Sequence, residues 1–145
     1  MRCVVQRVRS ASVSVSDEIV GEISQGLLVL VGFSNEDEAP PLSAMAKKLY
    51  EMRIFANAEG RFDRSLSDVD GGILLVPQFT LFAETKKGRR PDFYKALKPE
   101  LAQSFFDEFV KEVKQLTEHT ATGIFGADMQ VALVNDGPVT IIVDL

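Results

Sequence analysis

Asn135-Asp136-Gly137-Pro138-Val139-Thr140 stands between two apolar runs, residues 131–134 and 139–143, near the end of the 145-residue chain. Asn and Asp side chains bond to their own backbone, Gly accepts a positive φ and Pro fixes φ, so all four residue types favour turns. A tight hairpin needs only Asn-Gly or Asp-Gly. Pro138 removes a donor from a strand ladder and therefore belongs at an edge or a bulge. The stretch predicts a turn between two strands, with a more constrained backbone than a simple hairpin requires.

Outward from this stretch, most of the chain has strand-like patterns. Residues 27–31 are apolar on both faces, which predicts a central buried strand, and residues 73–76 predict a second one. The other expected strands are residues 3–8, 10–16, 19–23, 54–55, 120–125, 129–134 and the last run from residue 139. Because several strands follow one another at the start of the chain, antiparallel hairpins are favoured there.

Two segments have helical spacing. The first is expected to begin at Pro40-Pro41 and to end near Arg53, and the second to begin at Pro99. The apolar stripe expected on the second helix is Leu101, Phe105, Phe109, Val113 and Leu116, widened by Ala102, Phe106 and Val110. Residues 57–72 have a loop-like composition. The prediction is an α+β fold with a mainly antiparallel, curved or barrel-like sheet and two principal helices.

Composition limits the class of protein. With 46% hydrophobic and 26% charged residues, the chain suits one globular domain over residues 1–145. No apolar run approaches the length of a membrane span, and no signal peptide is visible at Met1-Arg2, so we expect a cytoplasmic protein without membrane contact. The net charge of -5 means that any nucleic-acid contact must use a local patch. The basic segment 84–92 is the candidate, with a solvated loop as the alternative; its cations are Lys86, Lys87, Arg89 and Arg90.

Few residues suit conventional catalysis. His119 is the single histidine and follows a helix in polar surroundings, which is typical of a surface residue. Cys3 lies inside a strand and is expected to be a small buried hydrophobe. One Cys and one His exclude an internal disulfide and make a Cys/His metal site unlikely to form, and no phosphate-binding glycine loop is present. An enzyme of this sequence would work without a triad, a metal or a cofactor.

Three motifs resemble the D-aminoacyl-tRNA deacylase family over the whole chain. They are Met1-Arg2-Cys3-Val4-Val5-Gln6-Arg7-Val8, Gln78-Phe79-Thr80-Leu81 and the stretch 135–140. The resemblance implies hydrolysis of the ester that links a D-amino acid, or glycine, to the 3′-terminal adenosine of tRNA. It also implies a homodimer in which each Gly-Pro pair, joined by a cis peptide bond, reaches into the partner's active site and rejects L-aminoacyl-tRNA.

The same resemblance assigns site residues. Catalysis falls to Gln78, Phe79 and Thr80, and metal ligands are absent. The substrate-binding positions are Arg7, Pro77, Phe125, Met129, Gly137 and Pro138. Thr80 acts either as a nucleophile or only through backbone groups together with the RNA's own 2′-hydroxyl. We favour the second, because no partner that would deprotonate Thr80 is visible. Arg7, a charge among valines, is the candidate for holding Gly137-Pro138 in place, the alternative being an exposed edge residue.

One position departs from the family pattern. The family has Ser directly before Gln-Phe-Thr, whereas this chain has Pro77, which carries neither a hydroxyl nor a backbone N–H. A related group with a different stereochemical range also has proline there, but Phe79 and Val139 follow the main family. Two other functions stay open: a tRNA-binding dimer with weakened catalysis, and an unrelated small-molecule hydrolase.

Overall fold

The computed structural model describes residues 1–145. Its strands are β1 (Arg2–Val15), β2 (Glu18–Ile23), β3 (Gly26–Gly32), β4 (Phe55–Ala56), β5 (Phe62–Arg64), β6 (Gly72–Pro77), β7 (Thr120–Thr122) and β8 (Gln130–Asp144). Its helices are α1 (Leu42–Glu51), the short 3₁₀ helix η1 (Phe79–Phe82) and α2 (Pro99–Leu116). The α+β class and the two principal helices are confirmed. No helix combines the length and the apolar character that crossing a membrane requires.

The main sheet is mixed, with three antiparallel and two parallel strand pairings. Its order is β2-β1-β3-β6-β7, and β8 pairs with β1. β1 is antiparallel to β2, β3 and β8, whereas β3–β6 and β6–β7 are parallel. The two parallel pairings were not predicted. They arise because α1 lies in the connection from β3 to β6 and α2 in the connection from β6 to β7, and a helical crossover makes the joined strands parallel.

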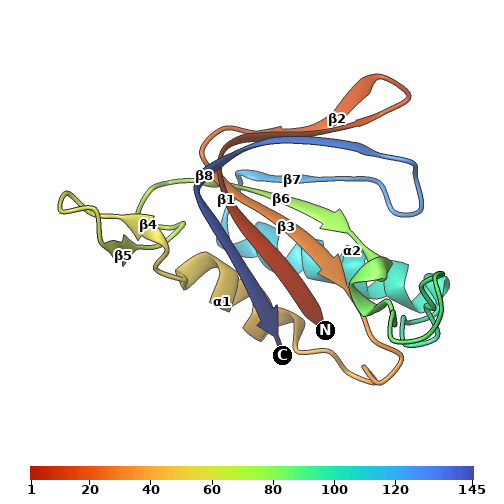
Figure 1. Ribbon diagram of the computed structural model, residues 1–145. Coiled ribbons are helices and arrows are strands. Elements are labelled where there is room, and N and C mark those ends of the chain that lie inside the picture. Colours follow the sequence, from red (N-terminus) through yellow and green to blue (C-terminus); the bar gives the residue numbers. More distant parts are fainter.

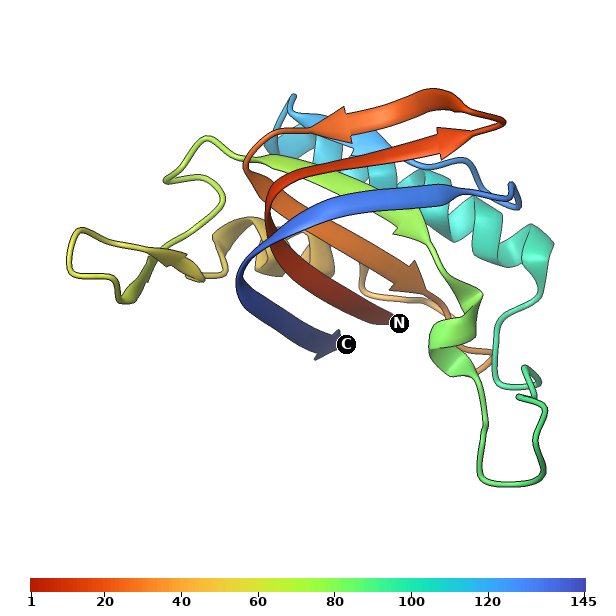
Figure 2. The same cartoon turned by 45° about the horizontal axis from the view of Figure 1, so that its top comes forward.

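The sheet curls until β2 lies against β7, as Figures 1 and 2 show. Gly21 of β2 makes this approach possible: a Cβ there would lie 2.6 Å from the carbonyl oxygen of Thr122 in β7. Any side chain would push the strands apart at that point. The barrel-like curvature expected from the sequence is therefore present, and it is nearly closed.

The central strands carry apolar side chains on both faces because each face meets its own core. In β3, Leu27 and Val29 pack toward the helices, whereas Leu28 faces the inside of the curled sheet. β6 alternates in the same way, with Ile73 toward the helices and Leu74 inside. Figure 1 shows α1 and α2 together on the outer side of the sheet. The prediction that residues 27–31 form a central buried strand is confirmed.

The sequence predicted a turn between two strands at residues 135–140, but the chain does not reverse its direction there. β8 runs through it as one strand, and both of its halves pair with β1. The register slips between Gln6 and Ser10 of β1, so the turn-forming residues make a bulged bend instead of reversing the chain. Gly137 has a φ of +135° and the Gly137-Pro138 peptide bond is cis. Turn chemistry was recognised correctly, but a bulge uses the same residue types.

Two local expectations also need correction. Residues 57–72 are not all loop, because β5 pairs with β4 as a small hairpin. On α2 the buried face comprises Ala102, Phe106, Phe109 and Val113, while Leu101 is 52% exposed and Leu116 is 36% exposed. The predicted apolar stripe was centred about one residue away from the buried face, because Ala102 and Phe106 of α2 face α1 and the sheet.

This face gives a direct test of the core. Phe109 is fully buried, so we expect Phe109→Ala to lower the free energy of unfolding by about 3–5 kcal/mol. Leu101→Ala on the same helix should cost less than about 1 kcal/mol, because Leu101 is already half in solvent. Urea unfolding followed by circular dichroism measures both values. Equal losses for the two variants would contradict this assignment of the buried face.

Candidate active site

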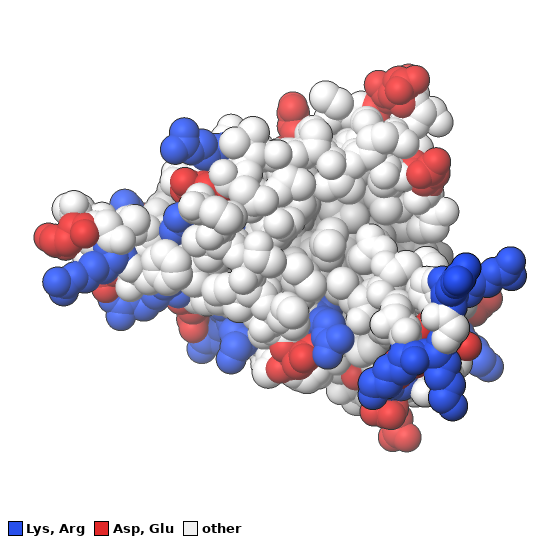
Figure 3. Space-filling view, viewed as in Figure 1, with Lys and Arg blue, Asp and Glu red and all other residues white.

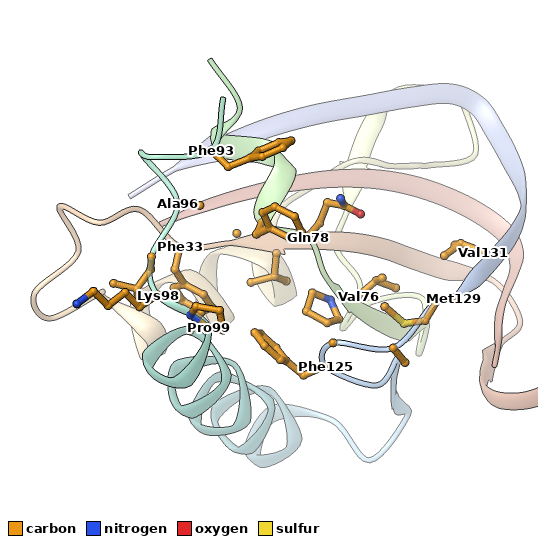
Figure 4. Close-up of a pocket in the computed structure, with 18 residues that line it drawn as sticks. Phe33, Val76, Gln78, Phe93, Ala96, Lys98, Pro99, Phe125, Met129 and Val131 are labelled. Carbon is orange, nitrogen blue, oxygen red and sulfur yellow. The ribbon is translucent and has the colours of Figure 1, made fainter. Parts of the chain in front are cut away.

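A cavity with a volume of about 650 Å³ lies where η1, the start of α2 and the β7–β8 connection meet. Eighteen residues line it, twelve of them hydrophobic, and Lys98 is its one charged side chain. Five of the predicted site residues lie on its wall: Pro77, Gln78, Phe79, Phe125 and Met129. Figure 4 labels Gln78, Phe125 and Met129. An apolar cleft of this size with few polar groups suits an organic ligand.

The predicted catalytic segment forms one rim of the cavity. β6 ends at Pro77, and the Gln78 N–H donates to the Val31 carbonyl over 2.7 Å, which fixes the segment to β3. The Gln78 side-chain amide donates to the Thr80 hydroxyl. No carboxylate or imidazole bonds to Thr80, so the structure supplies no base for its hydroxyl. The side chains of Gln78 and Thr80 thus contact each other as predicted, without forming a nucleophile–base pair.

Backbone donors at this rim are free. Phe79 and Thr80 begin η1, and the first N–H groups of a helical turn have no partner inside that turn. Neither N–H finds another acceptor in the protein, whereas the next one, of Leu81, bonds to the Gln78 carbonyl over 3.3 Å. Two adjacent unbonded N–H groups beside a cavity can bind a carbonyl or oxyanion oxygen.

Arg2 supports η1 from behind, a role that sequence reasoning missed. Its guanidinium binds the Asp144 carboxylate through Nε at 2.7 Å and Nη2 at 3.0 Å. The remaining Nη1 donates to the Leu81 carbonyl at 3.3 Å, and the group lies over the Phe82 ring. The hydrogen bond from Arg2 lowers the pKa of Asp144, so the pair stays ionised at neutral pH. An arginine paired with the penultimate residue gave no sequence signal of this contact.

Aromatic and thioether side chains complete the wall. Phe93, which no prediction placed in the site, packs edge-on against Phe79 with ring centroids 5.1 Å apart. Phe125 lies 6.4 Å from the Phe106 ring of α2, measured between centroids. Met129 sits close to Gly123, where a Cβ would approach its sulfur to 2.6 Å. Pro77 is half-buried and ends β6 opposite Val31, a position that needs no further donor.

Arg7, Gly137 and Pro138 lie together, but outside this cavity. Arg7 is 8% exposed; its Nε donates to the Asp136 carbonyl at 3.0 Å and Nη1 to the Ile54 carbonyl at 2.5 Å. Its Nε is also 3.3 Å from the Asp136 carboxylate. The alternative of an exposed edge residue is therefore excluded for Arg7, and the bend of β8 rests on its guanidinium. Gly137 and Pro138 themselves are exposed.

The two groups are far apart within one chain. Thr140 of β8 pairs with Gln6, Gln6 with Leu28, and Leu28 with Leu74. Gln78 lies four residues beyond Leu74 on the far strand. Ordinary strand spacings put Gly137-Pro138 roughly 15 Å or more from Gln78. The predicted site residues therefore fall into two sets, which one chain does not bring together.

The remaining candidates contribute no catalytic chemistry. His119 is half exposed, with Nε2 3.5 Å from Asp70, in a second, polar cavity. Cys3 is fully buried, and burial raises the pKa of its thiol to about 12. Hydrogen bonds from the Ser65 backbone and hydroxyl lower the pKa of Asp68, so this exposed carboxyl is no proton donor at neutral pH. No group of three metal-ligating side chains occurs in the structure.

Comparison with known proteins identifies the family of the chain. The sequence profile of the family described as "D-Tyr-tRNA(Tyr) deacylase" matches residues 4–144. A D-aminoacyl-tRNA deacylase of Chloroflexus aurantiacus is 51% identical over 144 residues, which cover 99% of this chain and 90% of that protein. A D-aminoacyl-tRNA deacylase of Roseiflexus sp. is 54% identical over 144 residues, covering 99% of this chain and 93% of that protein.

Solved structures show the same fold. A protein described as "c-Myc DNA Unwinding Element Binding Protein" superposes with a TM-score of 0.93 at 40% identity, covering 100% of this chain and 99% of that one. A "probable eukaryotic D-amino acid tRNA deacylase" superposes with a TM-score of 0.86 at 19% identity, covering 99% and 98%, which is a likeness of fold alone. The profile and the curated relatives span nearly every residue of the chain, which therefore belongs to the D-aminoacyl-tRNA deacylase family of ester hydrolases.

Proposed function

We propose that this deacylase removes D-amino acids and glycine from the 3′ end of tRNA, and that the main chain at Gly137-Pro138 of a partner subunit excludes L-amino acids. The observation that carries the proposal is the split of the site. One set of residues forms a cavity beside free backbone donors, while the other is an exposed bend at the surface. A second copy of the chain would unite them.

The cavity suits the terminal adenosine. Its apolar wall offers the Phe79 and Phe125 rings to a base, and it carries no carboxylate that would repel the adjoining phosphate. With the base inside, the ester lies at the rim near Phe79 and Thr80, and the amino acid points outward. The substrate is thus oriented by its RNA end, which is the same for every aminoacyl-tRNA.

The chemistry needs orientation and charge stabilisation. The neighbouring 2′-hydroxyl already activates an aminoacyl-tRNA ester. Attack of a water molecule on its carbonyl carbon places negative charge on the carbonyl oxygen, and the N–H groups of Phe79 and Thr80 are free to bind it. The bond to the ribose oxygen then breaks, and that oxygen leaves as a hydroxyl. Removing one such donor from an enzyme costs about 2.7–4 kcal/mol of transition-state stabilisation. The Gln78 amide already occupies the Thr80 hydroxyl, which favours catalysis by backbone groups and the 2′-hydroxyl over a Thr80 nucleophile.

The proposed assembly as a homodimer is supported by the exposed edge of β8. β8 is a fifteen-residue edge strand, because β1 is its one partner in the sheet. Long edge strands are templates for further pairing unless they are covered. Val134 and Ile142, on either side of the bend, are 53% and 64% exposed, so two large apolar side chains face solvent on this unpaired strand. A two-fold axis would cover both copies of this strand and bring each bend to the other chain's cavity.

Stereochemical selection then comes from main-chain atoms. Gly137 has no side chain, so its backbone approaches a ligand closely. A clash next to the substrate's Cα rejects an L side chain whatever its size, and it spares D side chains and the single hydrogen of glycine. Arg7 holds the approach in place through Asp136 and Ile54. We place the enzyme in the cytoplasm, where aminoacyl-tRNA is made.

Pro77 motivates the alternative of a tRNA-binding dimer with weakened catalysis. Pro77 lines the cavity and provides no hydrogen-bond donor where the family has serine. The two free N–H groups beside it are unaffected by this change. Because the proposed chemistry uses those groups, the catalytic function is the better supported of the two.

Selectivity is the first test. We expect single-turnover hydrolysis of D-tyrosyl-tRNA and glycyl-tRNA, and at least about a hundredfold slower hydrolysis of L-tyrosyl-tRNA, equivalent to about 2.7 kcal/mol of barrier. The measurement uses the same tRNA in all three cases, with uncatalysed hydrolysis subtracted. Comparable rates for the two tyrosyl enantiomers would reduce Gly137-Pro138 to a structural bend.

Mixed dimers test whether the site is shared. In Gly137→Ala the new Cβ would lie 2.8 Å from Val139 and 3.3 Å from Arg7, so the bend must shift. Phe79→Pro removes one free N–H at the first position of η1, which accepts proline. Each variant alone should be inactive. Equal amounts refolded together should recover about a quarter of native activity, because half the dimers are mixed and each holds one complete site.

Sedimentation of the native protein and of both variants provides the control, since all should be dimers. No recovery on mixing, with exchange of subunits verified by differently tagged chains, would place the whole site in one chain. A fully active native monomer would have the same meaning.

The role of Pro77 is tested by Pro77→Ser. If the backbone carries the chemistry, the rate on D-tyrosyl-tRNA should change by less than about tenfold, under roughly 1.4 kcal/mol of barrier. Single-turnover rates of both proteins give the comparison. A much larger gain would mean that this chain is catalytically impaired, and would favour the binding function.

A further inference from the structure

We propose that the hairpin of residues 84–92, together with Lys98, is the surface that binds the phosphates at the acceptor end of the tRNA substrate. The inference rests on the proposed function, because it assigns the part of that substrate that the cavity leaves outside. It assigns a surface to the RNA rather than to the ester, and it concerns residues that take no part in the chemistry.

An isolated antiparallel bridge closes residues 84–92 into a hairpin-shaped loop. Glu84 and Asp92 face each other across an isolated antiparallel bridge, with N–H to carbonyl distances of 2.7 and 2.9 Å. Gly88 forms the tip with a φ of +72°, a conformation that suits glycine. The four cations Lys86, Lys87, Arg89 and Arg90 lie between the bridge and the tip on both limbs. The bridge thus joins the two ends of the segment, and the four cations lie between them.

Both limbs start at the cavity. The first follows η1 directly, and the second leads to Phe93, which packs on Phe79, and then to Lys98 at the cavity wall. Figure 4 shows Phe93 and Lys98 among the residues that line the cavity. The span from Glu84 to Gly88 reaches at most roughly 15 Å. Phosphates bound there belong to the nucleotides next to the ester, and not to distant parts of the tRNA.

The cations of the hairpin are free. None of Lys86, Lys87, Arg89 and Arg90 takes part in an ion pair of the structure. The acid at the base of the hairpin is neutralised elsewhere: Glu84 binds Lys95 over 3.0 Å, and this bond lowers the pKa of Glu84. Cations without partners keep their charge available for an external anion.

Positive charge is concentrated in residues 84–98, although the molecule as a whole is negative. Residues 84–98 contain six Lys or Arg and two Asp or Glu, a net charge of +4 in a chain whose total is -5. Figure 3 shows Lys and Arg gathered at the end of the molecule where Figure 1 places this segment. The rest of the chain carries -9 and repels a polyanion. RNA is thereby steered to the mouth of the cavity and away from other faces.

The test compares two double variants that change charge equally. Lys86→Gln with Lys87→Gln removes two hairpin cations. The control, Lys111→Gln with Lys114→Gln, removes two exposed cations without ion pairs from α2. The control positions lie at least about 18 Å along the helix from Pro99. The probes are D-tyrosyl-tRNA and the D-tyrosyl ester of adenosine, which lacks phosphates.

We expect the hairpin variant to have a raised KM for D-tyrosyl-tRNA, so that the ratio of kcat/KM for tRNA to that for the adenosine ester falls. The slope of log kcat/KM for tRNA against log salt should become shallower by about 1.4–1.8, the value for two phosphate contacts. The control variant should keep the native ratio and slope. Lys86→Arg with Lys87→Arg retains the charges and should restore both, which separates lost charge from lost structure.

Each outcome has a distinct meaning. Equal behaviour of the hairpin and control variants, with a native protein that hydrolyses both probes, overturns the phosphate surface and leaves the proposed function intact. A native protein that hydrolyses neither probe overturns the proposed function itself. Failure of the arginine variant to restore the slope also contradicts the inference, because phosphate binding needs only the charge.

Discussion

The buried guanidinium of Arg7 is the constraint on which the shape of this enzyme depends. A charged group in this position is tolerated only when its donors are satisfied. Arg7 meets that demand with the Ile54 carbonyl before β4 and with the carbonyl and carboxylate of Asp136 in β8. The Phe62 ring of β5 covers it, with its centroid 5.5 Å from the guanidinium carbon. Three segments distant in sequence thus meet at one side chain.

That meeting point explains the bend of β8. β1 needs a partner strand along its whole length, and β8 supplies it on both sides of the register slip. At the slip the backbone of Asp136 turns toward Arg7, and Gly137 takes a φ that other residues resist. Gly137 and Pro138 are consequently exposed, while Asn135 and Thr140 on either side of the bend remain paired with β1. In the proposed dimer this exposure is functional, because a main-chain probe must protrude from a rigid support in order to enter another chain's cavity.

Much of this could be predicted from the sequence. Alternating and continuous apolar runs determined the strands, and Pro40-Pro41 and Pro99 marked the helix starts. The sequence could not distinguish a bulge from a hairpin at residues 135–140, because both use Asn, Asp, Gly and Pro. The parallel strands were missed because the hydrophobic periodicity of a strand does not show which strand it pairs with or in which direction. The site residues assigned by resemblance fall into two sets in one chain, with Gln78 and Phe79 at the cavity and Gly137 and Pro138 at the exposed bend, as a site shared between two chains would require.

The residues that were missed share a physical character. Phe93 and Lys98 join the cavity because the hairpin returns the chain to η1, and Arg2 supports η1 because β1 and β8 end side by side near it. None of these contacts is local in sequence, and none involves an unusual residue type. They become visible only in the folded chain, where the start of β1 pairs with the end of β8, so that the two termini lie side by side, as Figure 2 shows.

Recognition in the proposed enzyme is therefore divided among parts that ignore the identity of the amino acid. The cavity takes a base that every tRNA carries, the hairpin takes phosphates, and the free N–H groups of Phe79 and Thr80 take a carbonyl oxygen common to all the esters. None of these contacts senses a side chain. A proofreading enzyme that must accept many D-amino acids cannot use a side-chain pocket, since such a pocket would prefer some of them. The enzyme then needs to distinguish only the configuration at the Cα of the amino acid. In the proposed dimer the rigid backbone at Gly137 does so by excluding an L side chain. The absence of a histidine or carboxylate at the cavity fits the same logic, because orientation of an already activated ester provides most of what catalysis requires.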